Sequence, residues 1–269
     1  MRPQPYGPPP RLGWDVNLQV QRWSYWPIYT LTPKAGQTAQ RTVVYLHGGA
    51  WVNQIAPQHW QLAAQIAAEA RVRVIVPIYP LVPFAIAAEV VPAIVELVAE
   101  AMTPDHSVCL AGDSAGGQMA LSAALILRNE RGVVLPRIVL ISPVLDLSLS
   151  NPLIDAVQSR DPWLTRAGLL EFAKSWCSDL PMTDPLVSPL SADLTGLGPL
   201  TLFSGTRDIL NPDARLLVDK VTAAGVDIDY HEQPGLVHVY PLMRTPESRA
   251  ARAIIVERLR SAGPVQGNP

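Results

Sequence analysis

The chain has 269 residues, 48% of them hydrophobic and 16% charged, a composition that suits one large α/β domain with a substantial core. Its 21 basic residues nearly balance its 23 acidic ones, so charge gives no basis for binding nucleic acid or an anionic membrane. Because the N-terminus lacks a signal peptide and no uncharged apolar run reaches the roughly 18 residues of a membrane-spanning helix, we expect a soluble, cytoplasmic protein without stable membrane insertion.

Apolar, β-branched runs alternate with helical patterns along the chain. Several of these runs are apolar on both faces, which is typical of parallel strands covered on both sides. The predicted strands are, in chain order, Trp26–Leu31, Thr42–His47, Val72–Ile78, Ser107–Ala111, Arg137–Ser142, Leu200–Ser204 and Val226–His231. The predicted helices are Pro57–Ala70, Ala85–Met102, Gln118–Arg131, Thr165–Cys177, Pro212–Ala224 and Pro246–Arg260. This alternation predicts a mostly parallel, doubly wound α/β sheet with helices on both faces.

We expect residues 1–269 to form a single domain. Residues 146–190 follow a predicted strand, are rich in proline and serine, and contain only one clear helix. An insert of that size is interpreted as a lid or a pocket wall rather than as a second domain.

The most informative sequence is Gly-Asp-Ser-Ala-Gly-Gly at 112–117, between a predicted strand and a predicted helix. Glycines two residues before and two residues after Ser114 match the nucleophile elbow. This turn is so tight that side chains at the glycine positions would collide with the neighbouring strand and helix. It holds the serine hydroxyl clear of the sheet, at the positive end of the following helix. Ser114 is therefore the candidate nucleophile.

A serine hydroxyl needs a base, usually a histidine oriented by a carboxylate. Of the five histidines, His238 lies in a glycine-containing loop between the last predicted strand and the last predicted helix. A base in that loop reaches the carboxyl edge of the sheet, so we interpret His238 as the base. The other four lie before the serine or within a predicted strand: His47, His59, His106 and His231.

The candidate acid is Asp208, which follows an apolar strand and a glycine turn 30 residues before His238, leaving room for one helix and one strand. Asp213 is the alternative acid, but its place after Asn211-Pro212 is equally typical of an acidic residue in the first turn of a helix. Three further aspartates lack the end-of-strand context: Asp179, Asp184 and Asp193.

Small residues that follow the strand at 42–47 predict an oxyanion hole. Gly48, Gly49 and Ala50 let backbone N–H groups point at a developing alkoxide without side chains in the way. The matching donor is the N–H of Ala115, the residue after the nucleophile. His47 precedes the serine in the chain and is interpreted as a residue that braces this loop.

These residues belong to a wider set of motifs: His-Gly-Gly-Ala at 47–50, Tyr-Pro-Leu-Val-Pro at 79–83, Gly-Asp-Ser-Ala-Gly-Gly at 112–117, Asp-Pro-Leu-Val-Ser-Pro at 184–189 and Ser-Gly-Thr-Arg-Asp at 204–208, with the loop around His238. With them the chain resembles the hormone-sensitive-lipase-like (bacterial family IV) esterases of the α/β-hydrolase fold, from about residue 42 to about residue 260. The resemblance implies one α/β-hydrolase domain.

The resemblance also implies Ser114 as nucleophile, His238 as base and Asp208 as its orienter. It implies oxyanion donors at Gly49, Ala50 and Ala115, with Gly48 close by. The chain departs from the family in having Ala50 where a third glycine is usual, which adds strain if that residue adopts a positive φ. It also departs in its short N-terminal segment, residues 1–40, which we interpret as a reduced or differently built cap, so the family does not imply the substrate size.

The predicted function is that of a serine carboxylic-ester hydrolase, which acts on short-to-medium acyl esters through an acyl-enzyme intermediate and needs no cofactor or metal. The expected partner is a small-molecule ester. Two alternatives use the same residues: an amide or formamide hydrolase, and a non-catalytic ligand-binding member of the fold. Candidate residues for the acyl pocket are the bulky rings Trp51, Trp163, Phe172 and Trp176.

Overall fold

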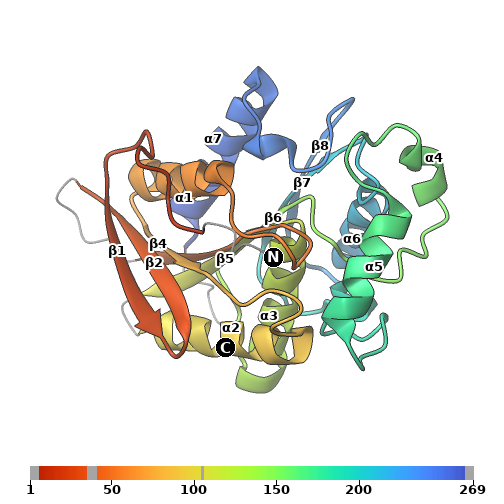
Figure 1. Ribbon diagram of the computed structural model, residues 1–269, viewed down its shortest axis with the longest axis horizontal. Helices are drawn as coiled ribbons and strands as arrows, with labels where there is room; N and C mark the ends of the chain where they lie inside the picture. Colours follow the sequence, from red (N-terminus) through yellow and green to blue (C-terminus); the bar gives the residue numbers. More distant parts are fainter. Residues whose placement is uncertain (1–5, 35–40, 104–105, 264–269) are drawn as a thin grey trace.

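The computed structural model describes residues 6–34, 41–103 and 106–263, and in that part of the chain one eight-stranded sheet is flanked by helices (Figure 1). The strands are β1 (Val16–Trp23), β2 (Trp26–Pro33), β3 (Arg41–Leu46), β4 (Arg73–Pro77), β5 (Ser107–Asp113), β6 (Ile138–Ile141), β7 (Leu200–Gly205) and β8 (Ile228–Gln233). The helices are α1 (Pro57–Ala70), α2 (Ala87–Ala101), α3 (Ala115–Arg131), α4 (Ile154–Gln158), α5 (Arg166–Cys177), α6 (Asn211–Ala223) and α7 (Pro246–Ser261), with short 3₁₀ turns η1 (Pro189–Ser191) and η2 (Tyr240–Leu242).

The strand order in the sheet is β1-β2-β4-β3-β5-β6-β7-β8. The six strands from β4 to β8 in this order pair in parallel, whereas β1 with β2 and β2 with β4 pair antiparallel. The prediction of a mostly parallel α/β sheet is therefore confirmed.

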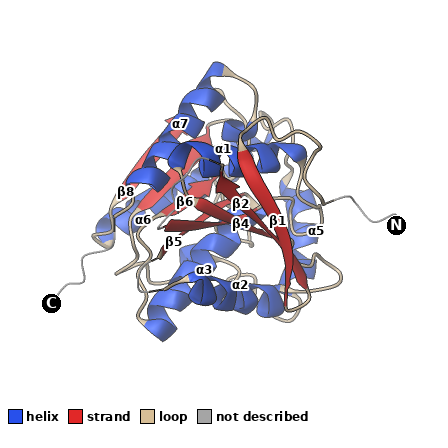
Figure 2. Ribbon diagram, turned by 90° about the vertical axis from the view of Figure 1, so that its left-hand side faces the viewer, coloured by secondary structure: helices blue, strands red, loops and turns tan. Residues whose placement is uncertain are grey.

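Two apolar cores lie on opposite faces of the sheet, as Figure 2 shows from the side. One core joins α1 and α7 to the sheet through residues such as Trp60 and Ile255, both 1% exposed or less. The other core packs α2, α3 and α6 through residues such as Ile94, Met119 and Leu217. Because helices cover both faces, the central parallel strands are buried on both sides, which explains their uninterrupted apolar sequences.

The parallel strands bring the candidate site residues to one edge of the sheet. Strands β3, β5, β7 and β8 all point the same way, so the segments that follow their carboxyl ends lie close together. These segments carry the glycine loop after Leu46, the elbow after Asp113, the acid after Gly205 and the base after Gln233. A parallel sheet typically binds its ligands at this edge.

Strand β1 is the main element that the sequence analysis misses. Its apolar residues Val16, Leu18 and Val20 do alternate with polar ones, but the strand lies at the sheet edge and is largely exposed, Val20 by 61%. Residues 16–33 therefore extend the sheet as a hairpin with β2. None of the described residues before Lys34 lines the pocket at Ser114.

The insert at 146–190 contains α4, which is not predicted, and α5, which is. Several predicted boundaries also move by one to three residues. Helix α3 begins at Ala115 rather than at Gln118, and β8 begins at Ile228 rather than at Val226.

In the described part of the chain, no helix has both the length and the apolar character needed to cross a bilayer.

The elbow leaves no room for a side chain at Gly116, where a Cβ atom would lie 2.0 Å from the carbonyl oxygen of Leu46. Since the Cβ would meet a backbone oxygen, which cannot rotate away as a side chain can, Gly116→Ala should lower the free energy of unfolding by about 3 kcal/mol or more. Denaturant unfolding measures the loss. The control is Gly263→Ala, where a Cβ meets nothing within 4 Å. Equal stabilities for the two variants would contradict the close packing described here.

Candidate active site

Ser114 lies at a sharp turn between β5 and α3, with φ 51° and ψ −119°. Its N–H donates to the carbonyl oxygen of Ile141 at 2.9 Å, and its own carbonyl oxygen accepts from Gln118 N–H at 3.1 Å. Gly112 and Gly116 allow the turn, because a Cβ at Gly112 would lie 2.4 Å from the carbonyl oxygen of Gly116. The hydroxyl of Ser114 therefore stands at the start of α3, as the elbow pattern predicts.

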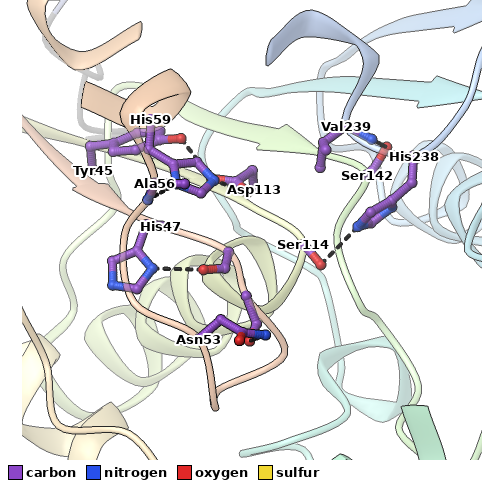
Figure 3. A network of polar contacts seen from close by, with 12 residues as sticks. Tyr45, His47, Asn53, Ala56, His59, Asp113, Ser114, Ser142, His238 and Val239 are labelled. Carbon is purple, nitrogen blue, oxygen red and sulfur yellow. Dashed lines mark hydrogen bonds and ion pairs between the residues drawn. The ribbon is translucent and has the colours of Figure 1, made fainter. Parts of the chain in front are cut away.

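His238 joins Ser114 to Asp208 through its two ring nitrogens. Its Nε2 lies 3.0 Å from Ser114 Oγ, and its Nδ1 lies 2.8 Å from Asp208 Oδ2. Figure 3 shows the histidine ring and the serine hydroxyl pointing toward each other from different loops. All three residues are buried, with exposed fractions of 7% or less. In this arrangement the carboxylate accepts the Nδ1 proton, so Nε2 is free to accept the serine proton.

The alternative acid, Asp213, is engaged elsewhere. It is buried in the first turn of α6, and its Oδ1 accepts from Asn151 Nδ2 at 2.8 Å. Burial raises the pKa of Asp213 to about 6. Of the two aspartates it is Asp208 that contacts His238, as the position of Asp208 after its strand predicts.

Three acidic groups determine the charge at His238. Burial by itself lowers the pKa of this imidazole, but the carboxylate of Asp208, together with Asp113 and Asp161, outweighs burial and raises the pKa above its usual value. The negative field therefore stabilises the imidazolium that forms when His238 accepts a proton.

The backbone after His238 is held in an unusual conformation. Val239 has a φ of 46°, a left-handed value that a β-branched residue rarely adopts, and its N–H donates to Ser142 Oγ at 3.0 Å (Figure 3). Ser142 is fully buried at the end of β6 and itself has a φ of 43°. The sequence analysis misses this contact, because nothing in the sequence pattern marks Ser142.

The predicted oxyanion loop lies directly beside the serine. A Cβ at Gly48 would lie 2.3 Å from Asp113 Oδ2 and 3.0 Å from Ser114 Cβ, so only glycine lets the loop approach this closely. Gly49 has a φ of 125°, and Ala50 has a φ of 51°. Ala50 therefore carries the strain that the sequence analysis makes conditional on a positive φ. Ala115, the fourth candidate donor, is fully buried in the first turn of α3.

A second polar cluster, centred on Asp113, lies under this loop (Figure 3). The buried carboxylate accepts from Tyr45 Oη at 2.6 Å and lies 3.3 Å from His59 Nε2. Since His59 Nδ1 accepts from the N–H of Ala56 at 2.9 Å, the proton of the neutral ring is on Nε2 and faces the carboxylate. Burial would raise the pKa of Asp113, but these partners lower it overall, so the group stays ionised. No sequence pattern marks His59 or Asp113 as part of the site.

His47 lies behind the loop, in the bracing position that the sequence analysis expects. Its Nδ1–H donates to the carbonyl oxygen of Gly48 at 2.6 Å, and its ring stacks on Tyr79 with 4.4 Å between centroids. Tyr79 Oη also donates to the carbonyl oxygen of His47 at 2.6 Å. Burial lowers the pKa of His47 to about 4, so its ring is neutral at pH 7.

Gln118 connects the elbow to the insert. Its Oε1 accepts from the indole N–H groups of Trp51 and Trp176, each at 3.2 Å, and its Nε2 donates to Ser122 Oγ and to the carbonyl oxygen of Leu186. The two indoles stack with 5.6 Å between centroids and are almost fully buried. The expectation that Trp51 and Trp176 line the acyl pocket is therefore wrong, because their rings point into the core to satisfy Gln118.

The pocket that opens at Ser114 has a volume of about 560 Å³. Its apolar wall comes from the insert, including α5, and its polar wall comes from the oxyanion loop and the start of α1. The apolar wall is formed by Trp163, Leu164, Leu169 and Phe172. The insert therefore forms one side of the pocket, and two of the four predicted rings, those of Trp163 and Phe172, do line it.

Asp161 attaches this wall to the loop of Asp208. Its Oδ1 accepts from the N–H groups of Trp163 and Leu164 at 2.8 and 2.9 Å, and its Oδ2 accepts from Ile209 N–H at 2.9 Å. The side chain of Arg207 also contacts the insert, because its Nε donates to the carbonyl oxygen of Arg160 at 3.1 Å. Arg207, the residue before Asp208, therefore stabilises the insert, and we assign it no contact with the substrate. No sequence pattern marks Asp161, because its bonds go to backbone N–H groups of segments that only the folded chain brings together.

The described residues of the site do not resemble a metal centre. Among the described residues, no cluster of three or more histidine, cysteine, aspartate or glutamate side chains is arranged to hold a metal ion. The polar groups around Ser114 are instead bonded to one another, as in the contacts of Asp113 and His238.

Comparison with known proteins agrees with this geometry. Residues 43–242 match a protein family described as having the alpha/beta hydrolase fold. An acetyl-hydrolase of Streptomyces hygroscopicus is 34% identical over 230 residues, which cover 82% of this chain and 76% of that protein. An esterase of Acinetobacter venetianus is 29% identical over 231 residues, covering 83% of this chain and 76% of that protein. A solved esterase of the bacterial hormone-sensitive lipase family superposes with a TM-score of 0.82 at 29% identity, covering 92% of this chain and 85% of the other.

Proposed function

Because this chain belongs to the hormone-sensitive-lipase-like esterases of the α/β-hydrolase fold, we propose that Ser114, His238 and Asp208 are its catalytic triad. The protein is a carboxylic-ester hydrolase. The single observation that supports these roles is the relay of two contacts, 3.0 Å from Ser114 to His238 and 2.8 Å from His238 to Asp208. The relatives named as esterases and acetyl-hydrolases favour esters over the amide and ligand-binding alternatives.

In the proposed reaction Ser114 Oγ attacks the ester carbonyl carbon while His238 Nε2 takes the hydroxyl proton. The C–O bond to the alcohol then breaks, and the imidazolium gives its proton to the departing oxygen. A water molecule, deprotonated by the same nitrogen, attacks the acyl-enzyme and releases the carboxylic acid and the free serine. Asp208 holds the ring in the tautomer that both half-reactions need and stabilises its positive charge.

We assign oxyanion stabilisation to the backbone N–H groups of Gly49, Ala50 and Ala115, with Gly48 placing the loop. The positive φ values of Gly49 and Ala50 support this assignment, because they turn the backbone at the point where the loop borders the pocket. Residues 146–190 would then act as the pocket wall or lid within a single domain. A cytoplasmic location stays a prediction from the sequence, which cell fractionation tests.

The triad assignment is tested by three variants. Ser114→Ala should remove almost all hydrolysis of p-nitrophenyl acetate, and Asp208→Asn should slow it by roughly two to four orders of magnitude by favouring the wrong histidine tautomer. The matched control is Asp213→Asn, which removes a buried carboxylate that does not contact His238 and should retain most of the activity. Equal losses in the two aspartate variants would refute the choice of Asp208.

The raised pKa of His238 predicts the pH dependence of kcat/KM. Only the neutral ring accepts the serine proton, so kcat/KM should fall as the pH decreases through the pKa of His238. The pH at which kcat/KM is half its maximum should lie above the usual histidine pKa of about 6.5. In Asp208→Asn the residual activity should have its midpoint at lower pH, because a carboxylate that favours the imidazolium is lost. A profile that is flat between about pH 5 and 8 would show that no histidine base limits the reaction.

The apolar wall predicts a preference for short acyl chains, of about two to six carbons. Each methylene that fits adds at most ~0.8 kcal/mol, and one that does not fit costs about 1–3 kcal/mol. Measuring kcat/KM on p-nitrophenyl esters from acetate to laurate gives the profile, and Phe172→Ala should move its maximum to longer chains. Phe84→Ala is the control, since Phe84 is 87% exposed and outside the pocket lining. A wild-type maximum at about eight carbons or more would refute the short-chain preference.

A further inference from the structure

A groove leads away from the catalytic pocket along helix α1. It consists of two smaller cavities, of about 290 and 140 Å³. Gln58, Trp163 and Val239 line both the catalytic pocket and the first of these cavities, so the two spaces share their walls. Gln58 and Gln61 continue into the second cavity. We call these two cavities the distal groove.

One wall of the distal groove is a row of amides on α1. Gln58, Gln61 and Gln65 are three and four residues apart, so they lie on one face of the helix and span about 10 Å along it. Gln65 is fixed by Glu69, whose carboxylate accepts from its Nε2 at 2.9 Å, and by Arg252, whose Nε donates to its Oε1 at 3.1 Å. Gln58 and Gln61 are at least partly exposed to the groove. Such a wall suits a polar ligand segment rather than an alkyl chain.

The distal groove carries positive charge. Arg244 lines both of its cavities, Arg252 lines the second, and the described lining contains no carboxylate. Arg252 is held in place by the carbonyl oxygens of Pro241 and Met243, at 2.6 and 2.8 Å. Arg244 is exposed, and no carboxylate of the described residues forms an ion pair with it. The guanidinium of Arg244 is therefore available to pair with an anionic group of the substrate.

The chemistry of His238 determines which part of the ester enters this groove. In the proposed reaction, on which this inference rests, His238 Nε2 protonates the departing alcohol oxygen, so the alcohol must lie on the histidine side of the scissile bond. Val239, the next residue in the chain, lines the start of the distal groove. The apolar wall of α5, in contrast, suits the acyl chain.

We propose that the distal groove binds the alcohol part of the substrate, and that Arg244 recognises an anionic group, a carboxylate or a phosphate, at the far end of a polar alcohol. The selectivity for that anion is then carried by a residue outside the lining of the catalytic pocket. The preferred substrates would be short-chain esters, such as acetates, of alcohols long enough to span the amide row.

The test compares two acetates that differ only in charge, 6-acetoxyhexanoate and its neutral isostere 6-acetoxyhexanamide. The wild-type protein should show a kcat/KM about three- to fivefold higher for the anion, mainly through KM, as expected for an exposed ion pair. Arg244→Gln should abolish the preference, and Arg244→Glu should reverse it. Arg249→Gln, an equal change of charge at an exposed position of α7 outside the groove lining, should retain the preference. Acetoxyacetate, whose carboxylate is only one methylene from the ester oxygen, should gain less from its charge than 6-acetoxyhexanoate does.

Two results would overturn the inference: equal kcat/KM for the two acetates in the wild-type protein, or a preference that persists in Arg244→Gln. Hydrolysis of p-nitrophenyl acetate separates this failure from a failure of the proposed function. If that ester is hydrolysed by the wild-type protein and not by Ser114→Ala, the esterase assignment stands whatever the acetates show. If phosphate-bearing acetates are preferred over carboxylates of equal length, the anion is identified as a phosphate.

Discussion

A Cβ atom at Gly116 would lie 2.0 Å from the carbonyl oxygen of Leu46. A Cβ atom at Gly48 would lie 3.0 Å from the Cβ atom of Ser114. These two contacts bring three segments together without intervening side chains: the end of β3, the loop that follows it, and the start of α3. The serine backbone adopts φ 51° in the space that remains. The close approach of backbone to backbone is therefore the constraint from which the position of the hydroxyl, and of every group that acts on it, follows.

Buried charge around this turn is kept in place by separate sets of donors. Asp208 is bonded to His238 and to the N–H of Leu210, whereas Asp113 is bonded to Tyr45 and faces His59. Because each carboxylate has its own partners, the buried ions remain satisfied. Both still contribute to the field at His238, which favours its protonated form. The arrangement thus combines an anchored site with an electrostatic bias toward the intermediate of the reaction.

The parts of the site that sequence reasoning could predict are those fixed by local backbone geometry. Glycine spacing marks Ser114, and the ends of parallel strands mark Asp208 and His238, because a residue's place in such a fold determines the edge that it reaches. The contacts of Gln118, Ser142 and Asp161 join segments far apart in the chain, and no local pattern marks them. Trp51 and Trp176 show the same limit. Their size suggested a pocket wall, but a single buried amide directs both indoles inward.

The conformation of Val239 has a consequence for how this protein tolerates change. A β-branched residue at φ 46° costs on the order of 1–3 kcal/mol, and that cost is borne by the loop that carries His238. Sequence drift that relaxes the backbone at this position would make the fold more robust while loosening the imidazole next to it. Thermal stability and catalytic rate therefore compete at this one residue. Selection for heat resistance alone would favour substitutions at Val239 that raise the stability and lower the activity.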